Sequence, residues 1–339
     1  MSSFSSLEVD STESYDMESI VTNGFQRYGP PSVQNYNFEN GRRYHAFREG
    51  SYLMPNDERE QDRLDFAHEI FRLLLRNGLT RAPMDPPPRR VLDLGTGTGA
   101  WAIDFASEYP DSEVIGVDLS PIQPRYAPPN CSFFVDDIES PWLFGPPFDF
   151  IHSRGLVGSI EDWDTLLGQI YDNLVDGGLV EFQEYELKYG ADDDTLSRTP
   201  AISLWQDKLI EAHESINRPV NIARTIRQRL QDRGFVDLHE EVAKVPVGPW
   251  PKNNRQKQIG ILMLQHSFDA LEALTLAPFS RVLRWSRDEM HDLMDRVRLE
   301  LANGSNHLYV TVHYVWGRKP ASNQPSSERP VSNGMDLGL

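Results

Sequence analysis

The feature that most constrains the fold is a short apolar strand that runs into three closely spaced glycines and then into a helix. Residues 91–94 read Val-Leu-Asp-Leu, the glycines are Gly95, Gly97 and Gly99, and residues 100–108 have the composition of a helix. Glycine lets the backbone turn sharply and approach a ligand closely. The helix that follows presents free amide groups at its N-terminus. This strand–loop–helix unit is typical of a nucleotide-binding α/β domain.

The alternation of strands and helices continues on both sides of the glycine loop. A helix is expected to begin after Asp57, which can cap it in a capping box completed by Glu60, and to stop at Asn77-Gly78. We expect strands at 91–94, 114–118, 132–135, 148–152 and 179–184, and further helices at 100–108 and 165–174. Short, nearly continuous apolar strands between helices predict a parallel sheet covered on both faces.

Beyond Glu186 this pattern is interrupted by helical insertions, expected at about 195–217 and 258–301. A helix near 221–233 and a strand near 235–247 lie between them, and a last strand covers 308–316. The insertions are interpreted as a lid over the carboxyl edge of the sheet, where such folds bind ligands. A thickened scaffold or a dimer interface explains them equally well.

Three segments are predicted for the whole chain. Residues 1–40 are acidic and rich in serine and are expected to be a disordered tail, and residues 321–339, rich in Ser, Asn and Pro, a second one. Residues 41–320 would form one catalytic domain. The first residues lack the basic and apolar regions of a secretory signal, and no apolar run is long enough to span a bilayer.

Charge and cysteine content narrow the function classes. The net charge of -18 repels phosphate backbones, so direct nucleic-acid binding is not expected. The most basic stretch, with Arg224, Arg227, Arg229 and Arg233, is interpreted as the solvated face of a helix. The single cysteine, Cys131, excludes an internal disulfide and fits a reducing, intracellular compartment.

The glycine loop does not by itself identify the cofactor. With Ala100 it also satisfies the pattern of dinucleotide binders. Asp118 ends the next strand roughly 20 residues after the glycines, where the ribose of either cofactor needs a carboxylate.

Carboxylates at the other strand ends favour S-adenosylmethionine over NAD. Asp93, two residues before the first glycine, could face a cationic amino group, whereas a pyrophosphate gives no reason for a negative charge there. After the third strand, Asp136 or Asp137 could accept the adenine amino group, and Ile138 could pack on the ring. Acidic groups at three successive strand ends suit a ligand with ribose, adenine and an amino acid but no phosphate.

The chain also resembles class I S-adenosylmethionine-dependent methyltransferases, and among them the fungal LaeA-like regulators of secondary metabolism and development. The resemblance covers about residues 35–318. It rests on the glycine loop and on the segments at 40–45, 52–58, 148–154, 162–163 and 177–181. It implies a Rossmann-like, seven-stranded, mostly parallel sheet whose last strand is antiparallel, and methyl transfer from S-adenosylmethionine. It also implies a nuclear or cytoplasmic location, and association with velvet-type regulatory proteins or a related methyltransferase subunit.

The candidate site residues follow from these motifs. The cofactor-binding candidates are Asp93, Gly95, Thr96, Gly97, Gly99, Asp118, Leu119, Asp136, Asp137, Ile138, Ser153 and Arg154. Methyl transfer needs a base only where the acceptor must lose a proton, and the candidates near the acceptor are His152, Glu184 and Tyr185. Tyr44 and Tyr52 could close the pocket, and no metal site is expected.

Several functions remain open at this stage. The leading hypothesis is a regulatory methyltransferase that acts on a protein or within a protein complex. A small-molecule O- or N-methyltransferase is the first alternative, and the aromatic residues of the insertions (Trp205, Phe268, Phe279 and Trp285) could form its acceptor pocket or only the lid core. A pseudo-enzyme scaffold and an NAD-dependent dehydrogenase are the others. The acceptor, the methylated atom and the oligomeric state do not follow from these motifs.

Overall fold

The computed structural model describes residues 36–45, 47–48 and 52–321. The predicted tails at 1–40 and 321–339 lie almost wholly outside these residues. The described fold begins with strand β1 (Asn37–Glu39), which pairs with β2 (Arg42–Tyr44), so the ordered chain includes the end of the predicted N-terminal tail. Among the described residues, no helix is long and apolar enough to cross a membrane.

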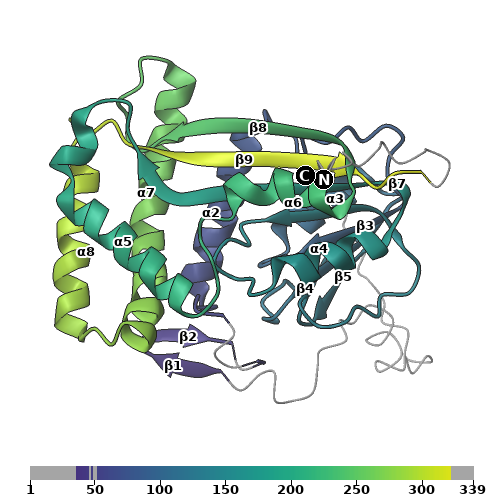
Figure 1. Cartoon of the computed structure of the whole chain (residues 1–339), viewed down its shortest axis with the longest axis horizontal. Coiled ribbons are helices and arrows are strands. Elements are labelled where there is room, and N and C mark those ends of the chain that lie inside the picture. The colour runs from purple at the N-terminus through teal and green to yellow at the C-terminus, as the bar shows by residue number, and fades with distance from the viewer. Residues whose placement is uncertain (1–35, 46, 49–51, 322–339) are drawn as a thin grey trace, which may run out of the picture.

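A seven-stranded sheet forms the centre of the molecule (Figure 1). Its strands are β3 (Arg90–Leu94), β4 (Glu113–Asp118), β5 (Cys131–Val135), β6 (Phe148–Arg154), β7 (Leu174–Gly190), β8 (Val236–Pro246) and β9 (Tyr309–Arg318). Their order across the sheet is β5-β4-β3-β6-β7-β9-β8, with β9 antiparallel to both of its neighbours and the other pairs parallel. The predicted sheet is confirmed, including its antiparallel last strand.

Helices cover both faces of the sheet because its central strands are apolar on both faces. Helix α3 (Ala100–Glu108) buries Trp101 and Phe105 against one face. Helices α4 (Trp163–Asp172) and α6 (Ile226–Arg233), the latter preceded by η3 (Ala223–Thr225), cover the opposite face. This double covering leaves the carboxyl ends of the parallel strands as the edge available to a ligand.

The predicted insertions form a helical layer at that end of the sheet (Figure 1). It contains η2 (Asp194–Arg198), α5 (Pro200–Ser215), α7 (Asn254–Ala277), η4 (Pro278–Val282) and α8 (Arg287–Ala302). Helix α2 (Glu58–Leu74) packs against α7, and the helical layer shares one apolar core with strands of the sheet. Of the aromatic residues proposed for these insertions, Phe279 and Trp285 pack edge to face in that core.

Three local predictions are wrong. The helical stretch expected at 258–301 is not continuous, because α7 ends at Ala277, η4 ends at Val282, and Ser286 begins α8 with a reciprocal capping box to Glu289. Strand β7 starts at Leu174, well before the predicted 179. Asp57 does cap α2, but the box is incomplete because the carboxylate of Glu60 pairs with Arg63.

Candidate active site

The glycine loop has the backbone conformation that its sequence requires. Gly95, Gly97 and Gly99 have φ angles of 64°, 58° and 83°, in the left-handed region that favours glycine. A Cβ atom on Gly99 would lie 2.5 Å from Cζ of Phe133, so the loop also packs too tightly for a side chain there. Helix α3 begins at the next residue. The loop therefore runs close beneath any ligand at the strand ends.

Asp118, at the end of β4, faces this loop. One carboxylate oxygen accepts the amide of Gly97 at 2.8 Å, and the other accepts the amide of Ser120 at 2.9 Å. Burial raises the pKa of Asp118 to about 6 in spite of these bonds. When ionised, the carboxylate keeps further lone pairs for hydroxyl groups of a ligand.

The first cavity, called here the outer cavity, lies beyond Asp118 and has a volume of about 660 Å³. Leu119, Asp136, Asp137 and Ile138 line it, as their positions in the sequence predicted. Asp137 accepts the amide of Glu139 at 2.9 Å, which holds the turn after β5. Carboxylate and apolar side chains thus meet at the end of this cavity.

Asp93 and His152 form a buried pair on the neighbouring strands β3 and β6. Asp93 accepts the hydroxyl of Thr96 at 2.6 Å and lies 2.7 Å from Nδ1 of His152. Burial lowers the pKa of His152 to about 4, so the ring is neutral and its proton lies on Nδ1. Its Nε2 is buried without a hydrogen-bond partner, and the ring stacks on Trp101 with centroids 3.7 Å apart.

Arg154 is a half-buried cation without a carboxylate partner. Its Nε donates to Gln183 at 3.0 Å, and Nη1 lies 3.1 Å from Nδ1 of His68. Its Nη2 is buried and has no partner, and no carboxylate among the described residues forms an ion pair with it. Burial lowers its pKa. Since an uncompensated buried charge is costly, the site is suited to receive an anion.

Ser153 and Glu184, two of the candidate residues, bond to each other and to the loop after β6. The hydroxyl of Ser153 donates to Glu184 at 3.4 Å, and Glu184 accepts the amides of Leu156 and Val157 at 3.0 and 3.2 Å. Burial raises the pKa of Glu184 to about 7. Neither side chain lines the outer cavity or the second cavity described next, and Gly99 lines neither. The pair holds the loop after β6.

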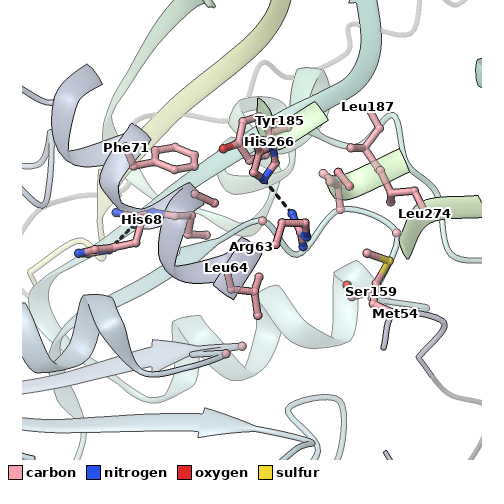
Figure 2. A pocket seen from close by; sticks show the side chains of 18 of the residues that line it. Met54, Arg63, Leu64, His68, Phe71, Ser159, Tyr185, Leu187, His266 and Leu274 are labelled. Carbon is pink, nitrogen blue, oxygen red and sulfur yellow. Dashed lines mark hydrogen bonds between the residues drawn. The ribbon is translucent and has the colours of Figure 1, made fainter. Parts of the chain in front are cut away.

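The second cavity, called here the inner chamber, has a volume of about 210 Å³ and lies between α2, β7, α5 and α7 (Figure 2). Tyr52, Gly95, Gly97 and Arg154 line both cavities, so the two meet at the glycine loop. The chamber is also lined by Arg63, Leu64, His68, Phe71, Asp93, Trp101, His152, Tyr185, Glu186, Leu187, Tyr189, Trp205, His213, Met263, His266, Leu274 and Val310.

Comparison with known proteins identifies the family. A model of the methyltransferase domain matches residues 66–240. The chain is 40% identical over 290 residues to methyltransferase pytC of Aspergillus terreus, which covers 85% of this chain and 90% of the relative. It is 41% identical over 299 residues to the secondary metabolism regulator LAE1 of Cochliobolus heterostrophus, with 86% and 97% covered. The chain belongs to the LaeA-like methyltransferase family. A further relative, 38% identical over 298 residues, is the protein-methionine methyltransferase laeA of Emericella nidulans, with 86% and 79% covered.

As a member of this family, the protein is an S-adenosylmethionine-dependent methyltransferase. Its donor set suits that cofactor, because carboxylates stand at or next to the ends of β3, β4 and β5, and Arg154, whose Nη2 has no partner, lines both cavities. Within the described part of the chain, no three His, Cys, Asp or Glu side chains are grouped as a metal site would require.

Several polar residues of the inner chamber in this methyltransferase are absent from the candidates that the sequence offered, among them the three described next. Arg63 and His68 lie on α2, whose apolar stripe was recognised through Leu64 and Phe71, and His266 lies on α7. Arg63 donates to Nε2 of His266 at 2.8 Å although 203 residues separate them in the chain (Figure 2). For these residues, the only signal in the sequence is the short spacing between Arg63 and Phe71 on one helix. Nothing in the sequence indicates that α7 faces α2.

Proposed function

We propose that the outer cavity and the adjoining part of the inner chamber bind S-adenosylmethionine in a methyltransferase that regulates secondary metabolism. The observation that carries this assignment is Arg154, whose unpartnered Nη2 lies on the chamber wall shared with Asp93 and the glycine loop. The amino-acid end of the cofactor carries one carboxylate and one ammonium group. Arg154 would bind the first and Asp93 the second.

The remaining candidate residues match the nucleoside end of the cofactor. Asp118 would accept the ribose hydroxyl groups, as carboxylates at this strand end do in related folds. Asp136 or Asp137 would accept the adenine amino group, and Ile138, only 9% exposed, would pack on the ring. We assign the whole cofactor site to one catalytic domain at residues 41–320.

When bound, the cofactor supplies a methyl group already activated by a sulfonium. The chain's own residues then have to align the acceptor and exclude water. Tyr52 lies where the two cavities meet and would shield the reacting atoms. Nε2 of His152 has a free lone pair, but this ring would act as a base only for an acceptor that reaches it, because the side chain is fully buried.

The regulatory role is supported by the relatives that are named secondary metabolism regulators. The naming of one relative as a protein-methionine methyltransferase supports a protein acceptor. We propose an intracellular location, in the cytoplasm or the nucleus, in keeping with the single cysteine. Velvet-type regulatory proteins or a related methyltransferase subunit are the proposed partners.

A second candidate function is methyl transfer to a small molecule within a biosynthetic pathway. The inner chamber favours it, because Trp205 of α5 and Leu274 of α7 roof the space next to the cofactor and would restrict a long peptide. The resemblance to the methyltransferase pytC is compatible with either acceptor.

Titration calorimetry with S-adenosylmethionine tests the proposed function, with NADH and an Asp118→Ala variant as comparisons. We expect micromolar binding of S-adenosylmethionine that is lost in the variant and absent for NADH. Folded protein that binds no S-adenosylmethionine would overturn the cofactor assignment for the isolated chain and leave a scaffold role.

A further inference from the structure

Two polar side chains of the inner chamber, Arg63 and His266, are arranged to donate hydrogen bonds. Arg63 is fixed by Glu60, with Nε and Nη2 at 3.0 and 2.5 Å from the two carboxylate oxygens, and its Nη1 donates to Nε2 of His266 at 2.8 Å. Because Nε2 of His266 accepts this bond, the ring proton lies on Nδ1. His266, which lines the chamber, therefore carries a donor on Nδ1, and Figure 2 shows the residue beside Arg63 and Tyr185.

The protonation state of His266 does not change under physiological conditions. Burial, with a smaller contribution from the Arg63 charge, lowers the pKa of His266 to about 3. The ring therefore stays neutral and keeps its Nδ1 proton. Among the described residues, this Nδ1 has no hydrogen-bond partner.

The carboxylates of the chamber, in contrast, are already engaged. Its two carboxylates among the described lining residues are Asp93 and Glu186. Asp93 is bonded to Thr96 and His152 and is assigned to the cofactor ammonium. Glu186 pairs with Arg224 at 2.6 Å and lies 2.8 Å from Nε2 of His313. A cationic acceptor such as a lysine ammonium would find no free carboxylate here.

The charge balance in the chamber also disfavours a cationic acceptor. Glu60 compensates Arg63, and in the proposed cofactor pose Asp93 and Arg154 compensate the ammonium and the carboxylate. The sulfonium charge is then left without a partner in an apolar enclosure. An acceptor that brings a negative charge would compensate it, and a second positive charge would be repelled.

We propose that the inner chamber takes an apolar small molecule that carries an anionic oxygen, such as a carboxylate, phenolate or enolate, and that Arg63 and His266 bind this molecule through its oxygen. This inference rests on the proposed cofactor site and on the second candidate function, methyl transfer to a small molecule, and adds the acceptor class to it. Phe71, Leu187, Trp205, Met263, Leu274 and Val310 form the apolar wall.

The transfer step needs no additional reactant. A lone pair of the anionic oxygen forms a bond to the methyl carbon while the carbon–sulfur bond breaks. The electrons of that bond remain on sulfur, so a sulfonium and an anion become a neutral thioether and a neutral methyl ester or ether. No proton is released, in keeping with the absence of a free carboxylate on the chamber wall among the described residues.

Three probes that share one apolar body test this proposal. Hydrocinnamate, hydrocinnamamide and phenylpropylamine are each titrated into the protein saturated with S-adenosylhomocysteine. We expect hydrocinnamate to bind about 10- to 100-fold more tightly than the amine, as for a hydrogen bond to a charged group. With S-adenosylmethionine instead, we expect the methyl ester of hydrocinnamate by mass spectrometry.

Two variants connect the preference to the named residues. The double variant Glu60→Gln/Arg63→Gln removes both charges together, so that no buried carboxylate is left unpaired, and His266→Phe removes the ring donor. Each should reduce the preference for hydrocinnamate about tenfold or more while binding of S-adenosylhomocysteine is retained. Arg59→Gln is the matched control, since Arg59 lies one turn earlier on α2 with its side chain 67% exposed and paired with Glu272.

The possible outcomes are distinct. If S-adenosylhomocysteine does not bind, the proposed function itself fails. If it binds, the acceptor proposal is overturned when the amine binds as well as the carboxylate, when none of the three probes binds at millimolar concentration, or when the preference is unchanged in both chamber variants. A preference that is lost in the chamber variants and kept in Arg59→Gln supports it.

Discussion

At the scale of single residues, burial shifts the pKa values of acidic side chains in the candidate site. The sequence motif does not reveal these shifts. Asp118 is half-buried beside the glycine loop, and desolvation raises its pKa from the usual value of 3.8 to about 6. The backbone amides of Gly97 and Ser120 oppose this effect without cancelling it. Cofactor binding should therefore depend on pH in a range where exposed aspartates do not titrate.

The affinity for S-adenosylmethionine is expected to decrease as the pH falls through about 6. Above this value Asp118 is ionised and accepts the ribose hydroxyl groups, and below it the added proton removes part of that acceptor capacity. Calorimetric titrations between about pH 5 and pH 8 measure the effect. Asp118→Asn should bind about 10- to 100-fold more weakly at neutral pH and lose most of the pH dependence. An equally steep pH dependence in the Asn variant would contradict this assignment.

A matched variant distinguishes the effect of contact at Asp118 from the general effect of removing one negative charge. Asp111→Asn removes the same charge from an exposed position in the turn between α3 and β4. We expect it to bind S-adenosylmethionine like the unaltered protein at every pH. A similar loss of affinity in Asp111→Asn would show that long-range charge, rather than contact at Asp118, causes the effect.

At the scale of elements, the glycine loop is determined by two separate requirements, a left-handed backbone and the absence of a side chain. Gly99 has both, since its φ is 83° and a Cβ would meet the ring of Phe133 on β5. Gly145 has only the first, because its φ is 82° and a Cβ there would extend into open space. The comparison of the two positions separates backbone strain from steric overlap.

Gly99→Ala is expected to destabilise the protein by about 2–4 kcal/mol, because strain and overpacking both contribute. Gly145→Ala should cost only about 1 kcal/mol, from the left-handed backbone alone. Denaturant unfolding of both variants measures the difference. Equal losses at the two positions would mean that Phe133 moves aside freely and that the contact at Gly99 is not important.

At the scale of the whole molecule, we expect ligand binding and stability to be coupled through Arg154. This half-buried cation lies between β6 and α2, bonded to Gln183 and His68 but to no carboxylate of the described chain. Its guanidinium packs over the ring of Phe71, with the guanidinium carbon 4.4 Å from the ring centroid. The folded state should therefore gain stability when a carboxylate binds there.

Saturating S-adenosylmethionine at about 100 times its Kd should stabilise the folded protein by about 2.7 kcal/mol. Arg154→Met keeps the apolar contact with Phe71 and removes the charge. We expect its free energy of unfolding without cofactor to change little, and the stabilisation by cofactor to disappear. Thermal unfolding with and without the cofactor measures both quantities. A variant that is still stabilised to the same extent would exclude Arg154 from carboxylate binding.

The sequence alone predicted most of the elements and a candidate cofactor end of the site. Local patterns predicted the strands, the caps and the glycine loop, because backbone conformation and apolar periodicity act over a few residues. They also placed Asp93, Asp118 and Asp136 at strand ends, and parallel strands bring their carboxyl ends to one edge of a sheet. The assignment of these residues to S-adenosylmethionine is still a prediction that the titrations above can test.

Only the tertiary structure decided the acceptor end. Arg63 and His266 meet across a gap of 203 residues, since the packing of α7 on α2 depends on the summed shape of many apolar side chains. Burial likewise separated Ser153 and Glu184 from the cavities, although they stand at the same sheet edge as Arg154. Side-chain burial and pKa are properties of the assembled core, and a local pattern carries no information about which distant segment completes it.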